Sequence, residues 1–204
     1  MILELERSDK VKTLVMNQHL LLHGQTFILS KISYPEHIDE MGALRIEAWK
    51  TEQGISQSFF SKNFWIDEQD QNAHHWMITK DGKVVASARL SIHHDYDSVP
   101  HSELFSEKDL GIHNVPPFAS INRLVVDPAQ RGMGLATILD RVRIVYALSQ
   151  NVNAIIAQPI ESRVEALKRL DFNVLGRLRA PIQFPDMNIF FMIRELSENR
   201  NVEY

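Results

Sequence analysis

The spacing of hydrophobic residues in the first half of the chain predicts a strand followed by a helix. Residues 26–29 form the first strand-like run. Ser33 and Glu36 have the spacing of a capping box, in which each side chain bonds the other residue's backbone amide. A helical stripe follows, and Gly54 suits its C-terminal end. The apolar positions of this stripe are Ile38, Met41, Leu44, Ala48 and Trp49.

A hairpin and a long loop are predicted next. Residues 75–79 and 83–90 resemble two strands and flank Asp81-Gly82, a dipeptide that tolerates the positive φ angles of a tight turn. The stretch 92–119 is rich in His, Asp, Ser and Pro, which predicts a loop. A loop of this length in a compact domain is usually functional.

The second half alternates between strand and helix patterns. Helices are predicted over residues 134–150 and 161–170, and strands over residues 121–126, 154–157, 172–178 and 189–193. This order implies a mixed sheet with a parallel crossover at its centre, so the fold class is α/β. We expect one domain over residues 25–204, preceded by an N-terminal extension, residues 1–24, that is either a helix or an extended arm.

Composition narrows the class of protein. Hydrophobic residues make up 44% and charged residues 24% of 204 residues, as in an ordinary soluble domain. The net charge of −4 argues against a nucleic-acid partner. No apolar run approaches a membrane span, and the first residues are charged too early for a signal peptide, so we expect a cytoplasmic protein. The absence of cysteine excludes a cysteine acyl-enzyme, zinc–thiolate and thiol redox chemistry.

The most informative segment joins the strand at 121–126 to the helix that follows. It carries Arg131 and two glycines, Gly132 and Gly134, directly before the helix. Glycine lets the backbone approach a ligand, and the first amides of a helix lack intrahelical partners and carry partial positive charge. This arrangement predicts a phosphate cradle to which Arg131 adds a charged fork. It matches neither the P-loop nor the dinucleotide-binding fingerprint.

Arg131, Gly134 and Ala136 fit the pattern Arg/Gln-x-x-Gly-x-Gly/Ala, and the segment resembles the pyrophosphate loop of the GNAT acyltransferases. The resemblance covers about residues 26–195 and is best over residues 121–172. It implies a mostly antiparallel sheet with one splayed parallel strand pair. It also implies acetyl-CoA as the acyl donor, direct attack by an amine, and no metal.

The resemblance assigns roles to the CoA-binding segment by position. The end of the strand would offer backbone groups to pantetheine, and an N–H near Val126 would polarise the thioester carbonyl, which is usually the largest catalytic contribution. The loop would offer amides to pyrophosphate. The implied CoA-binding residues are Leu124, Val125, Val126, Arg131, Gly132, Met133, Gly134, Leu135 and Ala136.

The catalytic acid and base are not evident. Many GNAT members have a general-base Glu where this chain has Ser120, and a Tyr that can protonate the leaving thiolate where it has Leu167. The catalytic candidates that remain are His93, His94, His113, Tyr96 and Ser120, with the histidines as bases and Tyr96 as the acid.

A second resemblance bears on the acceptor. Arg45 with Trp49, the Asp67 and Asp70 segment, residues 87–90 and residues 120–123 follow one another as in the acyl-homoserine-lactone synthases. Those relatives take acyl groups from acyl carrier protein. The resemblance implies that Arg45, Arg89 and Arg123 line the acceptor side, although arginines more often pair with nearby acids.

Three functions follow from these features. The first is acetyl transfer to a small-molecule or peptide amine, and the second is transfer of a longer acyl chain to an amino-acid-derived amine. The second would use an apolar tunnel for the acyl chain. The candidate wall residues could instead belong to ordinary core and loop packing; they are Trp49, Phe59, Phe60, Phe64 and Trp65. The third is a CoA-binding module without catalysis, which Ser120 and Leu167 motivate.

We expect no metal site, no nucleic-acid partner and no membrane partner. Five polar residues of the long loop suit metal coordination by type but lack fixed spacing, so we interpret them as ordinary loop residues. They are His93, His94, Asp95, Asp97 and His101. Because GNAT members are often dimers, a homodimer is open.

Overall fold

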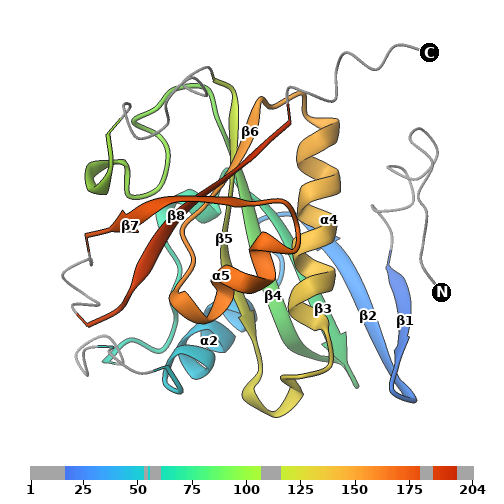
Figure 1. Cartoon of the computed structure of the whole chain (residues 1–204). Coiled ribbons are helices and arrows are strands. Elements are labelled where there is room, and N and C mark those ends of the chain that lie inside the picture. Colours follow the sequence, from blue (N-terminus) through green and yellow to red (C-terminus); the bar gives the residue numbers. More distant parts are fainter. Residues whose placement is uncertain (1–16, 53–54, 56–60, 107–115, 180–185, 197–204) are drawn as a thin grey trace, which may run out of the picture.

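An eight-stranded sheet forms the centre of the computed structural model, which describes residues 17–52, 55, 61–106, 116–179 and 186–196. The strand order is β1-β2-β3-β4-β5-β6-β8-β7, and every neighbouring pair is antiparallel except β5 and β6 (Figure 1). The strands are β1 (Gln18–Leu22), β2 (Gln25–Ile32), β3 (His74–Lys80), β4 (Lys83–His93), β5 (Phe118–Val126), β6 (Ala154–Ala157), β7 (Asn173–Leu178) and β8 (Ile189–Glu195). This confirms the predicted mixed sheet with one parallel pair.

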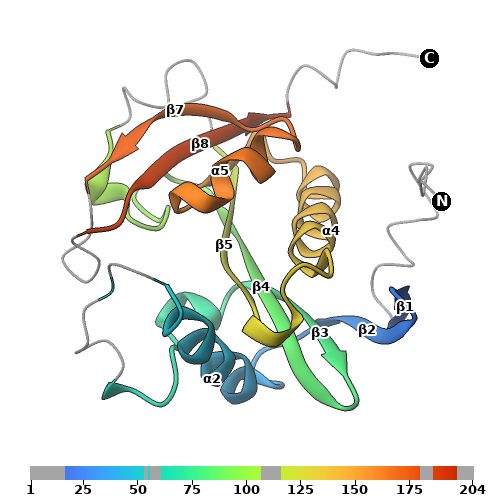
Figure 2. The ribbon, with the colours of Figure 1, turned by 60° about the horizontal axis from the view of Figure 1, so that its bottom comes forward.

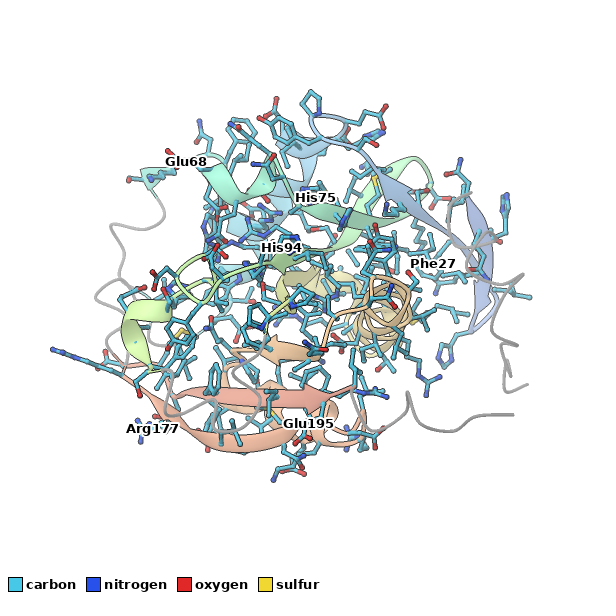
Figure 3. The ribbon with its side chains drawn as sticks, turned by 90° about the horizontal axis from the view of Figure 1, so that it is seen from above. Phe27, Glu68, His75, His94, Arg177 and Glu195 are labelled. Carbon is cyan, nitrogen blue, oxygen red and sulfur yellow. The ribbon has the colours of Figure 1, made fainter. Side chains whose placement is uncertain are left out.

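Helices cover both faces of the sheet (Figure 2). The α-helices are α2 (Ile38–Trp49), α4 (Leu135–Ser149) and α5 (Glu161–Lys168), and the short 3₁₀ turns are η2 (Glu68–Asp70), η3 (Ser102–Leu104) and η5 (Pro128–Gln130). Side chains alternate across a strand, so Met77 packs with α2 while its neighbours Trp76 and Ile78 belong to the large core beneath α4. Seen from above, α4 lies between the β1–β2 edge, marked by Phe27, and the β7–β8 pair (Figure 3).

The start of α2 differs from the prediction. The capping box at Ser33 and Glu36 is wrong, because the helix begins at Ile38 behind His37, which has φ of 53° and no side-chain capping bond. The Ser33 carbonyl instead accepts the Glu36 amide at 2.8 Å in a turn. A residue that precedes proline disfavours helical backbone, so Tyr34 before Pro35 prevents an earlier start. The helix ends at Trp49, and Gly54 lies outside the described residues.

Both ends of the predicted long loop belong to strands. Ile92 and His93 pair with Ala119 and Phe118, so β4 is longer and β5 begins earlier than expected. The last part of the predicted extension is a strand rather than a helix, because β1 pairs with β2 along its whole length. The helix predicted to end at Leu170 ends at Lys168.

The β3–β4 hairpin is confirmed. Asp81 and Gly82 have φ of 51° and 76°, the positive angles that a tight two-residue turn requires.

Candidate active site

A β-bulge interrupts β5 next to β4. Ser87 pairs with Val125 and Arg89 pairs with Asn122, so two residues of β5, Arg123 and Leu124, face Ala88 alone. Arg123 takes up the extra length with a left-handed backbone, φ 51°. A bulge bends its strand and increases the local twist, which turns this end of β5 away from its other neighbour.

That other neighbour, β6, ends before β5 does. The parallel pairing covers only four residues of each strand, Phe118–Ile121 with Ala154–Ala157. Beyond it, no strand of the described residues pairs with residues 122–126 on the β6 side. The Asp127 amide donates to the Val85 carbonyl of β4 at 2.8 Å. Because successive amides of a strand point in opposite directions, the Val126 amide points away from β4 and into this gap.

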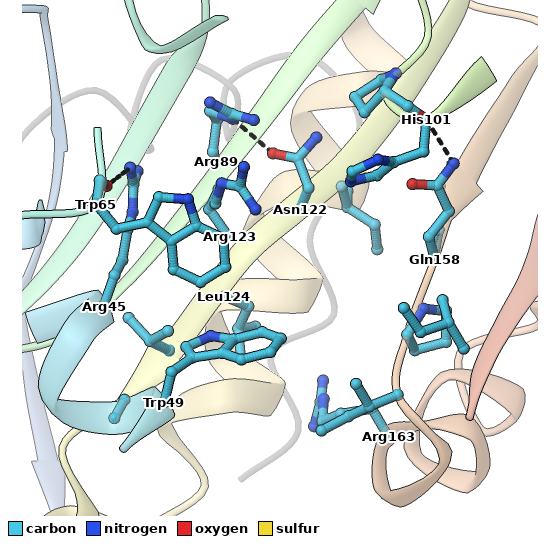
Figure 4. Close-up of a pocket in the computed structure, with 18 of the residues that line it drawn as sticks. Arg45, Trp49, Trp65, Arg89, His101, Asn122, Arg123, Leu124, Gln158 and Arg163 are labelled. Atoms are coloured by element: carbon cyan, nitrogen blue, oxygen red, sulfur yellow. Dashed lines mark hydrogen bonds between the residues drawn. The ribbon is translucent and has the colours of Figure 1, made fainter. Parts of the chain in front are cut away.

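A cavity of about 800 Å³ occupies the gap. Its walls come from α2, the segment before η2, β5, the start of α4, the chain that leaves β6, and η3 (Figure 4). Of the predicted CoA-binding residues, Leu124, Val125, Val126, Arg131 and Ala136 line it. The others, Gly132, Met133, Gly134 and Leu135, form the adjoining turn and the first residue of α4.

The glycine turn leaves the start of α4 open to a ligand. Gly132 and Gly134 have φ of 83° and 82°, and a Cβ added at either would meet no heavy atom within 4 Å. Gly134 is the N-cap residue and has no side chain to bond the first helical amides. These amides carry partial positive charge and have space before them, so the turn fits an anionic group such as pyrophosphate.

Arg131 does not reach over these amides. Its Nη2 donates to Thr51 Oγ1 at 2.8 Å, to Glu52 Oε1 at 3.1 Å and to the Ala48 carbonyl at 3.3 Å. It therefore joins the glycine turn to the C-terminal end of α2, across one mouth of the cavity.

The three arginines predicted on the acceptor side line one wall together. Arg45 and Arg89, both buried, share Asp70: Arg45 donates to both its carboxylate oxygens at 2.9 and 3.0 Å, and Arg89 donates at 3.1 Å. Arg89 and Arg123 share Asp67 in the same manner, with Arg123 Nη2 at 2.6 Å. Each arginine is therefore paired with an acid, and of the three only Arg123 is partly exposed.

Asp67 and Trp65 hold Arg123 in place. Burial raises the pKa of Asp67, but Arg123 and Arg89 outweigh it and lower this pKa to about 2. The Arg123 guanidinium lies over the Trp65 ring, 4.1 Å from its centroid.

Trp65 is fixed against α2, where its amide donates to the Gly42 carbonyl at 3.1 Å. A Cβ at Gly42 would lie only 2.8 Å from Ile66, so this close approach requires glycine.

None of the catalytic candidates that the structure describes lines this cavity. His93 Nε2 lies 2.7 Å from Ser120 Oγ, and both side chains are buried; His93 lines a smaller depression at Glu68 and Gln69. Burial lowers the pKa of His93 to about 4.

Two further candidates, His94 and Tyr96, are not among the residues that line the cavity. Tyr96 donates its hydroxyl to the Phe105 carbonyl at 2.8 Å, and His94 is exposed. His113 lies outside the described residues, as do Phe59 and Phe60.

The structure brings in residues to which the sequence assigned no catalytic role. His101, Gln158 and Arg163 line the cavity with Trp65 (Figure 4). Gln158 follows β6 and His101 lies in an irregular segment, so neither has a periodic pattern that would identify it. The one feature of the sequence that pointed to His101 was its place in the long, polar loop, which we expected to be functional.

Within the described part of the chain, no three His, Asp or Glu side chains gather in a way that could hold a metal ion. In the same residues, no helix combines the length and apolar character needed to cross a membrane.

A comparison with models of known protein families identifies the family. The Acetyltransferase (GNAT) family matches residues 38–170. A comparison with curated protein sequences finds no match.

Several solved structures share the fold at low sequence identity. FeeM, an N-acyl amino acid synthase from uncultured soil microbes, has a TM-score of 0.63 at 12% identity over 84% of this chain and 91% of its own. BjaI, a CoA-dependent acyl-homoserine lactone synthase with SAM and isopentyl-CoA, has a TM-score of 0.60 at 16% identity over 83% of each chain. The Escherichia coli ribosomal-protein-S18-alanine N-acetyltransferase has a TM-score of 0.55 at 16% identity over 87% of this chain and 99% of its own.

The family match spans well over half of the chain, and the solved structures share its sheet. The chain therefore belongs to the GNAT acetyltransferase family and has the fold of an acyl-CoA-dependent N-acyltransferase.

Proposed function

We propose that this protein transfers an acyl group from a CoA thioester to a primary amine that binds against Trp65 and Arg123. The observation that carries the proposal is the gap beside β5. It begins at the open N-terminus of α4, passes the inward-pointing Val126 amide, and continues to the arginine wall. One ligand can thus place its phosphates on helix amides and its thioester beside the acceptor.

The chain's own groups supply two contributions to the reaction. The inward-pointing Val126 amide of β5 stabilises negative charge on the thioester oxygen as the amine attacks, and a fixed donor in a site away from water is effective at this. The cavity holds both reactants in one place, which converts their encounter into a step within a complex. Direct transfer fits a chain without cysteine.

We propose acetyl-CoA as the first donor to test, since the glycine turn has the complete family pattern. A second candidate, a longer acyl-CoA, is supported by a different observation. The far side of the cavity has an apolar wall that includes Leu104, Leu178 and Ile189, next to Ile121 and Ala157. Such a wall suits an acyl chain of several carbons.

Binding of CoA, acetyl-CoA and decanoyl-CoA, measured by calorimetry and thermal shift, tests the donor site. A ligand that binds only the folded state stabilises it by about 2.7 kcal/mol at a hundredfold excess over Kd. Acetyl-CoA binding followed by thiol release with an amine supports the first candidate. Tighter binding and faster turnover of decanoyl-CoA support the second, and no binding of any of the three would overturn both.

A further inference from the structure

His101 lines the cavity at the end where the pairing of β5 with β6 stops. It directly precedes η3, and its imidazole lies between Asn122 of β5 and Gln158 beyond β6 (Figure 4). Gln158 Nε2 donates to the Pro100 carbonyl at 2.6 Å, which ties this segment to the opposite half of the sheet. A donor whose phosphates lie at the start of α4 and whose chain follows residues 126 to 124 would present its thioester toward Asn122, and therefore toward His101.

Most other proton acceptors in the cavity wall are already committed to cations. Both oxygens of Asp67 accept from Arg89 and Arg123, and both oxygens of Asp140 accept from Arg143 and Arg163. Glu52 pairs with Arg131 at the mouth of the cavity. The remaining carboxylates of the wall, Glu68 and Glu103, are exposed to solvent.

His101 differs from these acids because one ring nitrogen is available. Its Nδ1 faces Glu103 Oε1 at 3.6 Å, while its Nε2 has no hydrogen bond to any residue in the described part of the chain. At this separation, which is longer than a hydrogen bond, the Glu103 carboxylate acts on the imidazole through its charge and favours the protonated ring. Nε2 remains open to accept a proton.

We propose that His101 is the catalytic base, which accepts the proton of the attacking amine through Nε2. This inference rests on the proposed N-acyl transfer. The amine nitrogen bonds to the thioester carbon, its proton passes to His101, and the C–S bond breaks with its electron pair on sulfur. The protonated imidazole then returns the proton to the CoA thiolate, so that amide and CoA thiol leave and His101 is neutral again.

The charged groups around His101 agree with this role. Burial and Arg123 of β5 lower the pKa of His101, whereas Glu103 of η3 and Asp67 before η2 oppose that shift less strongly. A His with a lowered pKa is neutral near pH 7, which is the form that accepts a proton. Activity should therefore fall as the pH drops below this lowered pKa.

The test compares His101→Gln with His94→Gln, a matched control at an exposed histidine outside the cavity. General base catalysis typically contributes about 10²–10⁴-fold, so we expect kcat/KM of His101→Gln to fall at least about 100-fold and to lose the acidic limb of its pH profile. CoA affinity, measured by calorimetry, should be unchanged, and His94→Gln should behave as the wild type. Added imidazole should partly restore the activity of His101→Ala and should leave the activity of the wild type unchanged.

Three outcomes would overturn the assignment. If the wild type turns over while His101→Gln keeps its rate and its acidic limb, His101 is not the base and the proposed function stands. If the wild type binds no acyl-CoA and turns over no amine, the proposed function fails and this inference fails with it. A loss of CoA binding in His101→Gln together with no imidazole rescue of His101→Ala would assign His101 a structural role instead.

Discussion

Arg143 donates from Nη1 to the Asn122 carbonyl at 3.2 Å, at the residue where β5 loses its regular pairing with β4. The same nitrogen donates to the Arg89 carbonyl at 3.0 Å, on the other strand of the interrupted ladder. A bulge leaves backbone groups without ladder partners, and buried carbonyls need a donor. A buried cation from α4 therefore completes the hydrogen bonding of the distortion that opens the active site.

Replacing Arg143 by Met should destabilise the fold strongly. The change removes the donor for two buried carbonyls and one partner of the buried Asp140 carboxylate, and breaking a buried pair costs about 3–5 kcal/mol. Urea unfolding measures the loss. Arg141→Met, on the exposed side of the same helix, should change the free energy of unfolding by no more than about 0.5 kcal/mol. Equal stability of the two variants would refute the role of Arg143 at the bulge.

Gly134→Val should abolish CoA binding without preventing folding. The added side chain would occupy the space in front of the first amides of α4, while its positive φ costs about 1–2 kcal/mol of stability. Gly82→Val is a matched control, because Gly82 also has a positive φ with no neighbour within 4 Å but lies in the β3–β4 turn, which does not line the cavity. Calorimetry should find CoA affinity lost only in Gly134→Val; equal affinity in both variants would mean that the turn does not bind CoA.

Stability should fall when the pH drops from about 6.5 toward 4. Burial is the first cause that lowers the pKa of both His93 and His74 to about 4, from an ordinary value of 6.5. Between these values the unfolded chain binds a proton that the folded chain does not, so acid favours unfolding. Each histidine contributes at most about 1.4 kcal/mol per pH unit. Urea unfolding across this range should give a shallower pH dependence for His93→Gln than for the wild type, and an identical one would contradict the burial argument.

Trp65→Leu should weaken acceptor binding and leave donor binding intact. The indole holds the Arg123 guanidinium at the acceptor side, an interaction of about 1 kcal/mol, or roughly fivefold in KM for the amine. Steady-state kinetics with varied amine, beside calorimetry with CoA, separates the two effects. An unchanged KM for the amine would place the acceptor elsewhere.

Local patterns predicted the elements well where one physical preference dominated. Two strand-like runs around Asp81-Gly82 predicted the β3–β4 hairpin, and the two glycines predicted a turn directly before α4; both are found. Where two preferences competed, the prediction failed. Ser33 and Glu36 have capping chemistry, but Pro35 between them excludes the helical backbone that capping requires.

The site was predicted only in part, because much of it is made by contacts distant in sequence. Arg123 and Asp67 are 56 residues apart, and no periodicity records that they pair. The order of the arginines and acids pointed to a shared wall, and the structure brings them together. His101 carries no such signal, since its position depends on how Pro100 is held by Gln158.

The short pairing of β5 with β6 has a mechanical consequence. Strands β1–β5 and β6–β8 form two parts of the sheet, and the pairing that joins them covers only four residues of β5 and four of β6. An extended ligand in the gap would add its own polar chain to the free edge of β5, as a peptide adds to a sheet. It would also touch the chain that leaves β6. Such a ligand would lengthen the junction between the two parts of the sheet, so its binding would stabilise their association as well as the folded state.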